Sequence, residues 1–493
     1  MTDSYDEVLY PGYVLPHTHP DGLATQARLF GLEPAPVERC RVLELACGDG
    51  SNLISMAFGL PASQFLGIDR AGRPIAKGQA LLEALGLTNI ALRQLDLLDL
   101  PGDFPQFDYI IAHGLYAWAS AEVQEKLLAI LETHLAPQGV AYVSYNTYPG
   151  GHLRTMLREM MLFHIRDLDE PKARVSQAMA LLNLLAEAQP KPDAYGLFVK
   201  EELKRLAERQ APFVFHDELS EVYAPLYFYH FIEQAARHGL QYLAEAQLAS
   251  MSGGEFSPQA RHILDQLSSD PVLREQYLDF LKCRSYRQTL LCRQQLSLDR
   301  ALKPEHMTRF YVASPAHAVS TSPEGTQEFL GPQGASMTTA HPIVRAVMAQ
   351  LTEIWPRSLA FPELLERVRS RLGRSDPQDP RALGEILLRT CQAGLVELHV
   401  HQPRFTLGPG ERPLASPLAR LQLHSSDMIA TLRHTRVQIE GAIERQLLLL
   451  ADGTRDRSAL LEELNAFAAP RLISTQELEE ALAKITRLAL LLA

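Results

Sequence analysis

Residues 42–52, VLELACGDGSN, are the stretch that decides the fold, because an apolar run ends there in a loop with glycines at positions 48 and 50. The run is typical of a buried strand, and the following SNLISMAFGL has the apolar spacing of a helix. Glycine lets the backbone of the turn come close to a ligand, and the first turn of a helix presents free N–H groups. The stretch therefore predicts a strand, a ligand-binding turn and a helix in succession.

Similar units follow this one along the chain. Apolar runs that alternate with stretches of helical period are predicted as strands over residues 41–46, 64–69, 90–96, 107–113 and 139–145. Strands that alternate with helices form a parallel sheet covered on both faces. We therefore predict a doubly wound, Rossmann-like α/β sheet. Two later strand-like runs, 241–248 and 286–296, predict that the sheet is completed late in the chain.

The chain of 493 residues is too long for a single core and should divide into several units. Glycines at 150 and 151 end the regular alternation, and a segment rich in Ser, Pro, Gly and Thr follows residue 300. Three helices and a two-stranded wing, GLVELHVHQPRFTL, come after it in the order of a winged-helix domain. The predicted units are a catalytic domain over 1–300 with helical inserts at about 151–212 and 251–283, a linker with one hairpin over 301–340, a winged-helix-like domain over 341–415, and a helical C-terminal domain over 416–493.

Composition and charge narrow the class of protein. Hydrophobic residues make up 46% and charged residues 21% of the chain, as in soluble globular proteins. The sequence has neither a signal-peptide pattern nor an apolar stretch of about 18 residues, so we expect a cytoplasmic protein without membrane insertion. The net charge of -11 disfavours a main role in binding nucleic acid. The 5 cysteines form no CxxC pair and no metal-ligand spacing, which predicts no metal site.

Acidic residues beside the glycine turn decide between two cofactors that share this geometry. A dinucleotide would place a pyrophosphate at the helix end, where Glu44 and Asp49 would repel it, and Leu53 replaces the third glycine of GxGxxG. The same carboxylates suit the amino and sulfonium groups of S-adenosyl-L-methionine. Asp69 closes the next strand, where a carboxylate can accept from both hydroxyls of a ribose. We therefore predict S-adenosyl-L-methionine as the cofactor.

Residues near the other strand ends extend the predicted cofactor site. Asp96 can accept from the adenine amino group while Leu97 packs on the ring, and the alternative is a cap for the next segment. His113 can contact the methionine part or the acceptor, or it can be a structural histidine. Residues 17–19, HTH, precede a helix and predict a lid or an N-cap rather than a metal site. The predicted cofactor ligands are His19, Glu44, Gly48, Asp49, Gly50, Asn52, Asp69, Asp96, Leu97 and His113.

Aromatic residues follow the fourth and fifth strands, in FDYIIAHGLYAW and SYNTYPGG. At the carboxyl edge of the sheet they can form a mouth that attracts an ammonium or sulfonium group by cation–π interaction, or they can simply pack. Methyl transfer to an amine needs an unprotonated nucleophile, and His113 or a tyrosine can relay the proton. The predicted catalytic residues are His113, Tyr116 and Tyr148, the predicted substrate-binding residues are Tyr116, Trp118, Asn146 and Tyr148, and Tyr145 is also placed in the mouth.

Together SYDEVLY, HTHPDGLATQARLFGL, VLELACGDGSNL, FDYIIAHGLYAW and VSYNTYPGGHLR resemble the bacterial class I methyltransferases that carry a methyltransferase regulatory domain. That group is similar to rickettsial protein lysine methyltransferases that act on outer-membrane proteins. The resemblance implies N-methylation of protein lysine side chains and identifies 213–300 as the regulatory region that completes the sheet. The chain departs from the family pattern at Ala46, usually glycine, and at Gly151, usually tryptophan, which removes an aromatic near the predicted mouth.

Other functions stay open at this level. The chain can be a small-molecule or natural-product methyltransferase whose extra domains serve oligomerisation. In that case we expect a homo-oligomer. It can be a cofactor-sensing DNA-binding regulator, although the predicted winged helix has only a weak basic excess and no clustered basic stripe. A domain that binds the cofactor without catalysis is a further reading.

Overall fold

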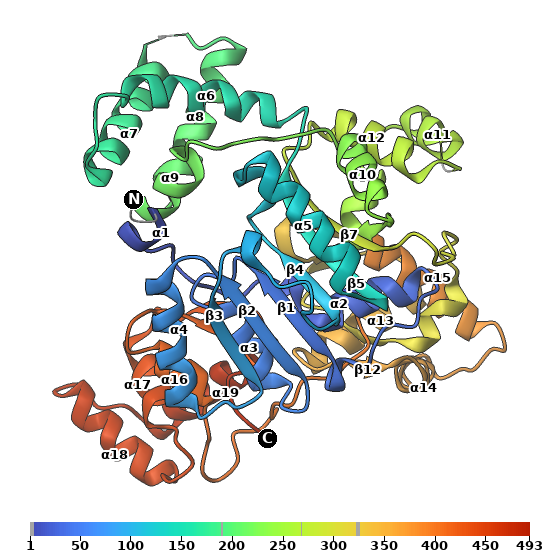
Figure 1. Ribbon diagram of the computed structural model, residues 1–493. Helices are drawn as coiled ribbons and strands as arrows, with labels where there is room; N and C mark the ends of the chain where they lie inside the picture. Colours follow the sequence, from blue (N-terminus) through green and yellow to red (C-terminus); the bar gives the residue numbers. More distant parts are fainter. Residues whose placement is uncertain (1–3, 189–190, 268, 322–325) are drawn as a thin grey trace.

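The computed structural model describes residues 4–188, 191–267, 269–321 and 326–493. Its centre is a seven-stranded sheet of order β3-β2-β1-β4-β5-β7-β6 (Figure 1). The first five strands are parallel, and β7 runs antiparallel to both of its neighbours. The strands are β1 Arg41–Leu45, β2 Gln64–Asp69, β3 Ile90–Gln94, β4 Phe107–Ala112, β5 Leu135–Asn146, β6 Leu240–Glu245 and β7 Tyr286–Arg293. The predicted doubly wound sheet and its late completion by two strands are therefore confirmed.

Helices cover both faces of the sheet, because successive side chains of a strand point to opposite sides. On β4, Tyr109 and Ile111 join the core under α2 Pro20–Leu29, α3 Ser51–Gly59 and α4 Gly72–Leu85. Ile110 and Ala112 join the opposite core, under α5 Ala121–His134 and α10 Phe228–Arg237. The near-continuous burial of β1 and β4 follows from this double cover.

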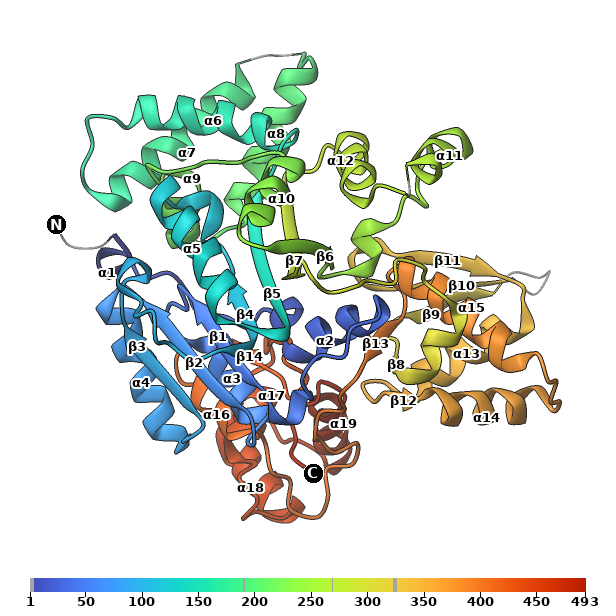
Figure 2. The same cartoon turned by 45° about the vertical axis from the view of Figure 1, so that its right-hand side comes forward.

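A helical unit follows the fifth strand and stands above the carboxyl edge of the sheet (Figure 1). It consists of α6 Gly151–His164, α7 Pro171–Glu187, α8 Ala194–Ala207 and α9 Ala211–Glu218, and it has a small core of its own. The N-terminal segment, with α1 Ser4–Glu7, lies against α9 (Figure 2). Tyr5 stacks on His216 at 4.2 Å between ring centroids, and His216 Nε2 is 2.7 Å from the carbonyl oxygen of Val8. A second helical stretch, α11 Pro258–Gln266 and α12 Pro271–Lys282, precedes β7.

A buried ion cluster fixes α12 to the last two strands of the sheet. The Arg287 guanidinium, whose side chain is 0% exposed, lies 2.6 Å from Glu245, 3.1 Å from Glu275 and 2.8 Å from Asp279. Its carbon also lies 3.8 Å from the centre of the Phe228 ring on α10. One arginine thus joins β6, β7, α10 and α12, the elements that close the sheet.

The segment 301–340, predicted as a linker with one hairpin, is more structured than that. It holds β8 Tyr311–Ala313 and a three-stranded antiparallel sheet of β9 His317–Thr321, β10 Gln327–Leu330 and β11 Ser336–Thr339. Beyond it lie α13 Pro342–Ile354, β12 Leu359–Ala360, α14 Phe361–Leu372, α15 Asp379–Gln392 and β13 Glu397–His399. This unit shares one continuous apolar core with the α2 and α3 face of the sheet.

The predicted two-stranded wing over 394–407 is wrong in its pairing. β13 pairs with β8, which in turn pairs with β12. The backbone N–H groups of Val400 and His401 instead donate to Asp21 at the start of α2, each at 2.8 Å. The residues after β13 therefore bind the sheet domain and cannot form a hairpin strand.

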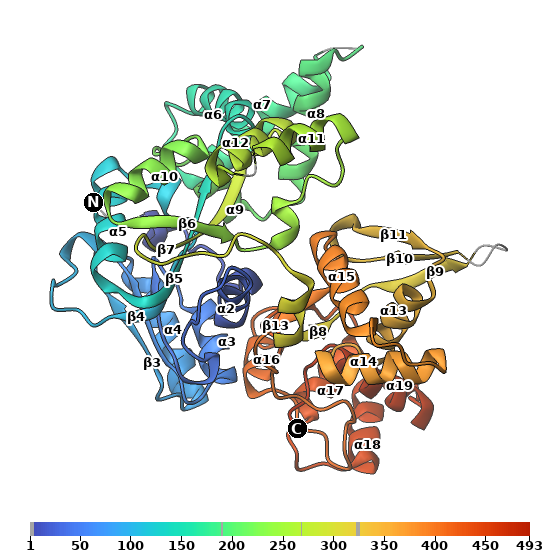
Figure 3. The ribbon, with the colours of Figure 1, turned by 90° about the vertical axis from the view of Figure 1, so that its right-hand side faces the viewer.

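The last unit packs around its own apolar core and also contacts the sheet domain (Figure 3). It holds α16 Pro417–Gln422, β14 Met428–Ala430, β15 Arg436–Gln438, α17 Ala442–Leu450, α18 Arg457–Ala468 and α19 Thr475–Arg487. Strands β14 and β15 form a hairpin that the sequence analysis did not predict. Within the described part of the chain, no helix has the length and apolar character needed to cross a membrane.

Candidate active site

The turn after β1 is built from left-handed residues. Ala46, Gly48 and Gly50 have φ of 57°, 57° and 69°. A Cβ at Gly50 would also lie 2.7 Å from the side chain of Leu92 on β3, so no other residue fits there without displacement. The turn directs the N-terminus of α3, which begins at Ser51, toward the carboxyl edge of the sheet.

Ala46 carries a backbone conformation that disfavours an L side chain by about 1 kcal/mol. We expect Ala46→Gly to raise the free energy of unfolding by about 0.5 kcal/mol, since glycine removes that strain but gains entropy in the unfolded chain. Gly86→Ala is the matched control, because Gly86 has φ 64° and open space at Cβ, and it should lower stability. Urea unfolding of both variants measures the effect, and a loss of stability in Ala46→Gly would refute this account of the turn.

Asp49 stabilises the turn after β1 through its side-chain hydrogen bonds. Its carboxylate accepts from the backbone N–H of Ser51 at 3.1 Å and from the Ser51 hydroxyl at 2.6 Å, and it pairs with Lys77 on α4 at 2.8 Å. Gly12 passes so close above it that a Cβ there would lie 1.9 Å from Asp49 Oδ1. Asp49 thus holds the turn, α4 and the N-terminal segment together, and its charge is balanced by a lysine.

Glu44, on β1, is a buried carboxyl with one unsatisfied oxygen. Oε1 accepts from Asn52 Nδ2 at 2.9 Å, whereas Oε2 is buried without a hydrogen-bond partner among the described residues. Burial raises the pKa of Glu44 to about 8, and the negative charges of Asp49 and Asp69 add to this effect. Buried acceptors are normally satisfied, so Oε2 is fitted to a donor supplied by a ligand. An ammonium group, such as the amino group of S-adenosylmethionine, meets that need.

Asp69 is the last residue of β2, and Asp96 follows the end of β3. Asp69 Oδ2 accepts from the Gly48 N–H at 2.8 Å, which ties the end of β2 to the turn after β1. Asp69 Oδ1 accepts from the N–H of Ala71 at 2.9 Å. Asp96 caps a short 3-10 helix, because its Oδ1 accepts from the Leu98 N–H at 2.9 Å. Its contact with the adenine stays a prediction. Leu97 is buried beside it.

His113 follows β4 and belongs to a polar cluster at the ends of three strands. Its Nδ1 lies 3.0 Å from the Tyr142 hydroxyl and 3.4 Å from the Ser144 hydroxyl, both on β5. Tyr286, the first residue of β7, packs edge-on against the His113 ring at 6.4 Å. Burial lowers the pKa of His113 to about 4 and raises the pKa of Tyr142, so both groups are neutral. The sequence analysis missed Tyr142, Ser144 and Tyr286, although it placed all three on predicted strands.

The predicted aromatic mouth is only partly correct in its geometry. Tyr116 is 1% exposed, donates to Gln234 on α10 at 2.5 Å and packs on Phe231, so its placement in the mouth is wrong. Tyr145 is also 1% exposed and is part of the same core. Both rings point to the α10 side of the sheet, because the alternation of β5 and the turn after β4 direct them there.

Trp118 is half-buried, and its ring is already in contact with cations. The guanidinium groups of Arg154 and Arg158, on α6, lie 5.2 Å and 5.3 Å from its centre. Arg154 also pairs with the buried Glu218 of α9 at 2.9 Å. Trp118 therefore anchors the helical unit to the sheet by cation–π contacts.

Tyr148 and Asn146 remain at the edge of the sheet. Tyr148 is half-buried and stacks on His152 at 3.8 Å, and Asn146 Oδ1 is buried without a hydrogen-bond partner in the described chain. A Cβ at Gly151 would lie 3.3 Å from the Tyr148 ring and from Pro225. A tryptophan at this position would thus need Tyr148 to move, which explains how Gly151 fits this chain.

His19 is the N-cap residue of α2. Its Nδ1 accepts from the backbone N–H of Asp21 at 3.1 Å. Its ring lies 5.0 Å from that of His434, which comes from the last unit of the chain. The capping alternative is thus correct for His19, and no cluster of three metal-ligating side chains occurs among the described residues.

His434 is a contributor that the sequence analysis missed. It lies at the turn between β14 and β15 and is buried against α3, with Nε2 at 3.0 Å from Asn52 Oδ1 and Nδ1 at 3.0 Å from the Ser55 hydroxyl. Because Asn52 Oδ1 is an acceptor, Nε2 carries the proton of the neutral ring. Asn52 in turn donates to Glu44, so the last unit of the chain supports the candidate site.

Three family models match this chain. "Methyltransferase domain" covers residues 36–209, "Predicted methyltransferase regulatory domain" covers 210–293, and "PKMT, C-terminal winged helix domain" covers 411–493. The last match falls on the segment for which the sequence predicted a mostly helical domain. The first two segments together form the central sheet. Strands β1 to β5 lie in the first segment, and β6 and the antiparallel β7 lie in the second.

Relatives in Rickettsia are similar over most of the chain. Protein RP028 of Rickettsia prowazekii is 38% identical over 235 residues, which are 94% of that protein and 48% of this chain. Protein RP789 of the same organism is 29% identical over 93% of this chain and 85% of its own length. The structure of PKMT2 from Rickettsia typhi in complex with AdoHcy has a TM-score of 0.88 and 28% identity, and it covers 98% of this chain and 100% of that one. With the site at the carboxyl ends of β1 and β2, these matches show that the chain belongs to the class I S-adenosylmethionine-dependent methyltransferases that carry a methyltransferase regulatory domain.

Proposed function

We propose that this protein methylates the side-chain amine of lysine in a protein substrate. The observation that carries the proposal is the likeness to PKMT2 of Rickettsia typhi, a name that abbreviates protein lysine methyltransferase, over 98% of this chain. The likeness extends beyond the cofactor-binding sheet to the helical unit and both C-terminal units.

The cofactor, when bound, supplies a methyl group on a sulfonium centre, which is transferred in line to the acceptor. Glu44 Oε2 is proposed to receive the amino group, Asp69 the ribose hydroxyls, and the Asn52 N–H in the first turn of α3 the methionine part. Gly48 and Gly50 shape the turn that lies beside the methionine part. Asp96 and Leu97 are proposed to border the adenine.

The polar cluster at the ends of β4, β5 and β7 is the proposed acceptor site. Lysine has a reference pKa of about 10.4, and a site of low dielectric lowers this value, so that the neutral amine becomes accessible. His113 is neutral in this cluster, with its orientation fixed by Tyr142, so it adds no positive charge beside the amine. Its low pKa makes it a weak proton acceptor. Tyr148 and Asn146 are proposed to guide the lysine side chain.

Transfer of a labelled methyl group tests the proposal. The purified protein is incubated with S-adenosylmethionine labelled in the methyl group and with a bacterial lysate, and label is counted in protein and small-molecule fractions. We expect label in protein, reduced to background in Asp69→Ala. Label in the small-molecule fraction alone would contradict the proposal and favour a metabolite methyltransferase.

Cofactor binding should release a proton near neutral pH. The pKa of Glu44 is raised to about 8 in the free protein, so the carboxyl is mostly protonated at pH 7, and an ammonium group beside Oε2 favours its ionised form. We expect AdoHcy to bind more tightly as pH rises from about 6 to about 8, and the released proton to appear in calorimetry as a dependence on buffer ionisation enthalpy. Glu44→Gln should bind more weakly and lose this dependence. A wild-type enthalpy that is equal in all buffers at pH 7 would contradict the assignment.

A further inference from the structure

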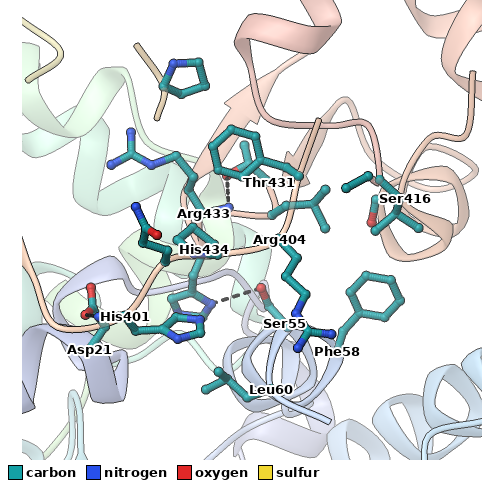
Figure 4. A pocket seen from close by; sticks show the side chains of 18 of the residues that line it. Asp21, Ser55, Phe58, Leu60, His401, Arg404, Ser416, Thr431, Arg433 and His434 are labelled. Carbon is teal, nitrogen blue, oxygen red and sulfur yellow. Dashed lines mark hydrogen bonds between the residues drawn. The ribbon is translucent and has the colours of Figure 1, made fainter. Parts of the chain in front are cut away.

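A cavity of about 540 Å³ lies behind α3, between the sheet domain and the C-terminal units (Figure 4). Its walls come from the starts of α2 and α16, the end of α3, the stretch after β13 and the turn between β14 and β15. None of residues 44–52, which form the turn after β1 and the start of α3, lines it. The cavity is therefore distinct from the proposed methyl-transfer site, and its volume is in the range of small-molecule sites.

The cavity combines apolar walls with unpaired positive charge at its rim. Phe58, Leu60 and Phe405 are among the apolar side chains that line it. Arg357 and Arg404 also line it and are exposed to solvent, and neither guanidinium has a hydrogen-bond or ion-pair partner in the described part of the chain. Figure 4 shows Arg404 extending beside Phe58 and Ser55. An aromatic or aliphatic ligand with an anionic group would satisfy both features.

The other charged side chains at the cavity are already paired. Asp21 accepts from His399 at 2.6 Å and from two backbone N–H groups. Burial lowers the pKa of His399, but the charges and hydrogen bonds of Asp21 and Glu397 outweigh it and raise the pKa to about 9. Arg433 pairs with Glu397 at 2.6 Å. His401 also lines the cavity and pairs with Glu38 at 2.6 Å. Among the described side chains that line the cavity, Arg357 and Arg404 are thus the charged groups left without a partner.

One wall of the cavity is His434, which also reaches the proposed cofactor site. His434 has a left-handed backbone with φ 54°, a conformation unfavourable for a residue other than glycine. Its ring is held by Ser55 and Asn52, and Asn52 holds Glu44. A ligand that braces the turn between β14 and β15 would therefore also fix Asn52 and Glu44.

We propose that this cavity binds a small organic anion, and that its occupation increases the affinity of the methyltransferase for its cofactor. The apolar body of the ligand lies against Phe58 and Phe405, and the anionic group pairs with Arg357 and Arg404. The coupling runs through His434 and Asn52. The binding site does not depend on the proposed reaction, whereas the coupling rests on Glu44 as a cofactor ligand.

Calorimetric titration of the full chain with naphthalene-1-sulfonate tests the binding site. We expect saturable binding of one molecule per chain, and about tenfold weaker binding of naphthalene-1-methanol, which lacks the charge, and of inorganic sulfate, which lacks the apolar body. The double variant Arg357→Gln with Arg404→Gln should lose at least tenfold in affinity. Arg412→Gln, an exposed arginine outside the cavity, is the control and should bind as the wild type does. Absence of saturation, or equal binding by the double variant, would overturn the site.

Titration of AdoHcy with and without saturating naphthalene-1-sulfonate tests the coupling. We expect about fivefold tighter AdoHcy binding in its presence, and the reciprocal effect on the sulfonate. His434→Asn tolerates the left-handed backbone but is too short to make both contacts, so it should abolish the coupling. Coupling that persists in His434→Asn, or is absent in the wild type, would overturn this part. Failure of AdoHcy to bind without the sulfonate would instead contradict the proposed function.

Discussion

Asp69→Ala is expected to weaken AdoHcy binding by at least 100-fold. A carboxylate that accepts from both ribose hydroxyls makes two charge-assisted hydrogen bonds, each worth about 1.5–3 kcal/mol. The same carboxylate holds the N–H of Gly48 at 2.8 Å, so its removal also loosens the turn after β1. Calorimetric titration with AdoHcy measures the loss.

Two other aspartates provide the comparison for this result. Asp96→Ala should cost only about tenfold, because a single contact to the adenine is lost. Asp99→Ala removes an exposed carboxylate close to Asp96 in sequence and should leave the affinity unchanged. Wild-type affinity in Asp69→Ala, with an unchanged far-ultraviolet spectrum, would show that the ribose does not bind at the end of β2.

Arg287→Met is expected to destabilise the protein by about 3–5 kcal/mol, the largest effect on stability that we predict. Arg287 is fully buried among Glu245, Glu275 and Asp279, and methionine would remove the cation that contacts all three. Arg284, which pairs with Asp279 at 2.8 Å, would remain. Burial already raises the pKa of Asp279 to about 6 in the presence of Arg287. Without it, the folded state should hold protons on these carboxyls more tightly than the unfolded chain.

This difference in proton binding sets the direction of the pH dependence. A carboxyl whose pKa is raised in the folded state favours folding below that pKa and loses this contribution as pH rises through it. The destabilisation by Arg287→Met should thus be smaller at pH 5 than at pH 8. Urea unfolding at both pH values measures it. The control is Arg367→Met, which removes an exposed pair with Glu363 and should change stability by less than about 0.5 kcal/mol. An equal, small effect of both variants would contradict the role given to the buried cluster.

The sheet and the turn after β1 could be predicted from sequence because their signals are local. An apolar run, two glycines and the acidic residues near them lie within a few positions of one another, and parallel strands bring their carboxyl ends to one edge. The alternating pattern also predicted β6 and β7 as late strands. Glu44 and Asp69 followed from the same reasoning.

The errors arise where a residue's environment is set by distant parts of the chain. Tyr116 follows β4 as predicted, but a short 3-10 turn directs its ring into the core under α10. β13 pairs with β8, which lies far upstream in the sequence. The residues that follow β13 bind Asp21, which lies near the start of the chain. His434 reaches Asn52 across a sequence separation that no local pattern reveals. Such contacts depend on the packing of whole units against one another.

The most direct measurement is peptide mass spectrometry after methyl transfer from S-adenosylmethionine with a deuterated methyl group. Proteins of a bacterial lysate are incubated with the wild type or with Asp69→Ala, digested and sequenced by fragmentation. We expect deuterated methyl groups on lysine Nε atoms in the wild-type reaction only. Deuterated methyl groups confined to other side chains or to metabolites, or equal labelling by both enzymes, would contradict it.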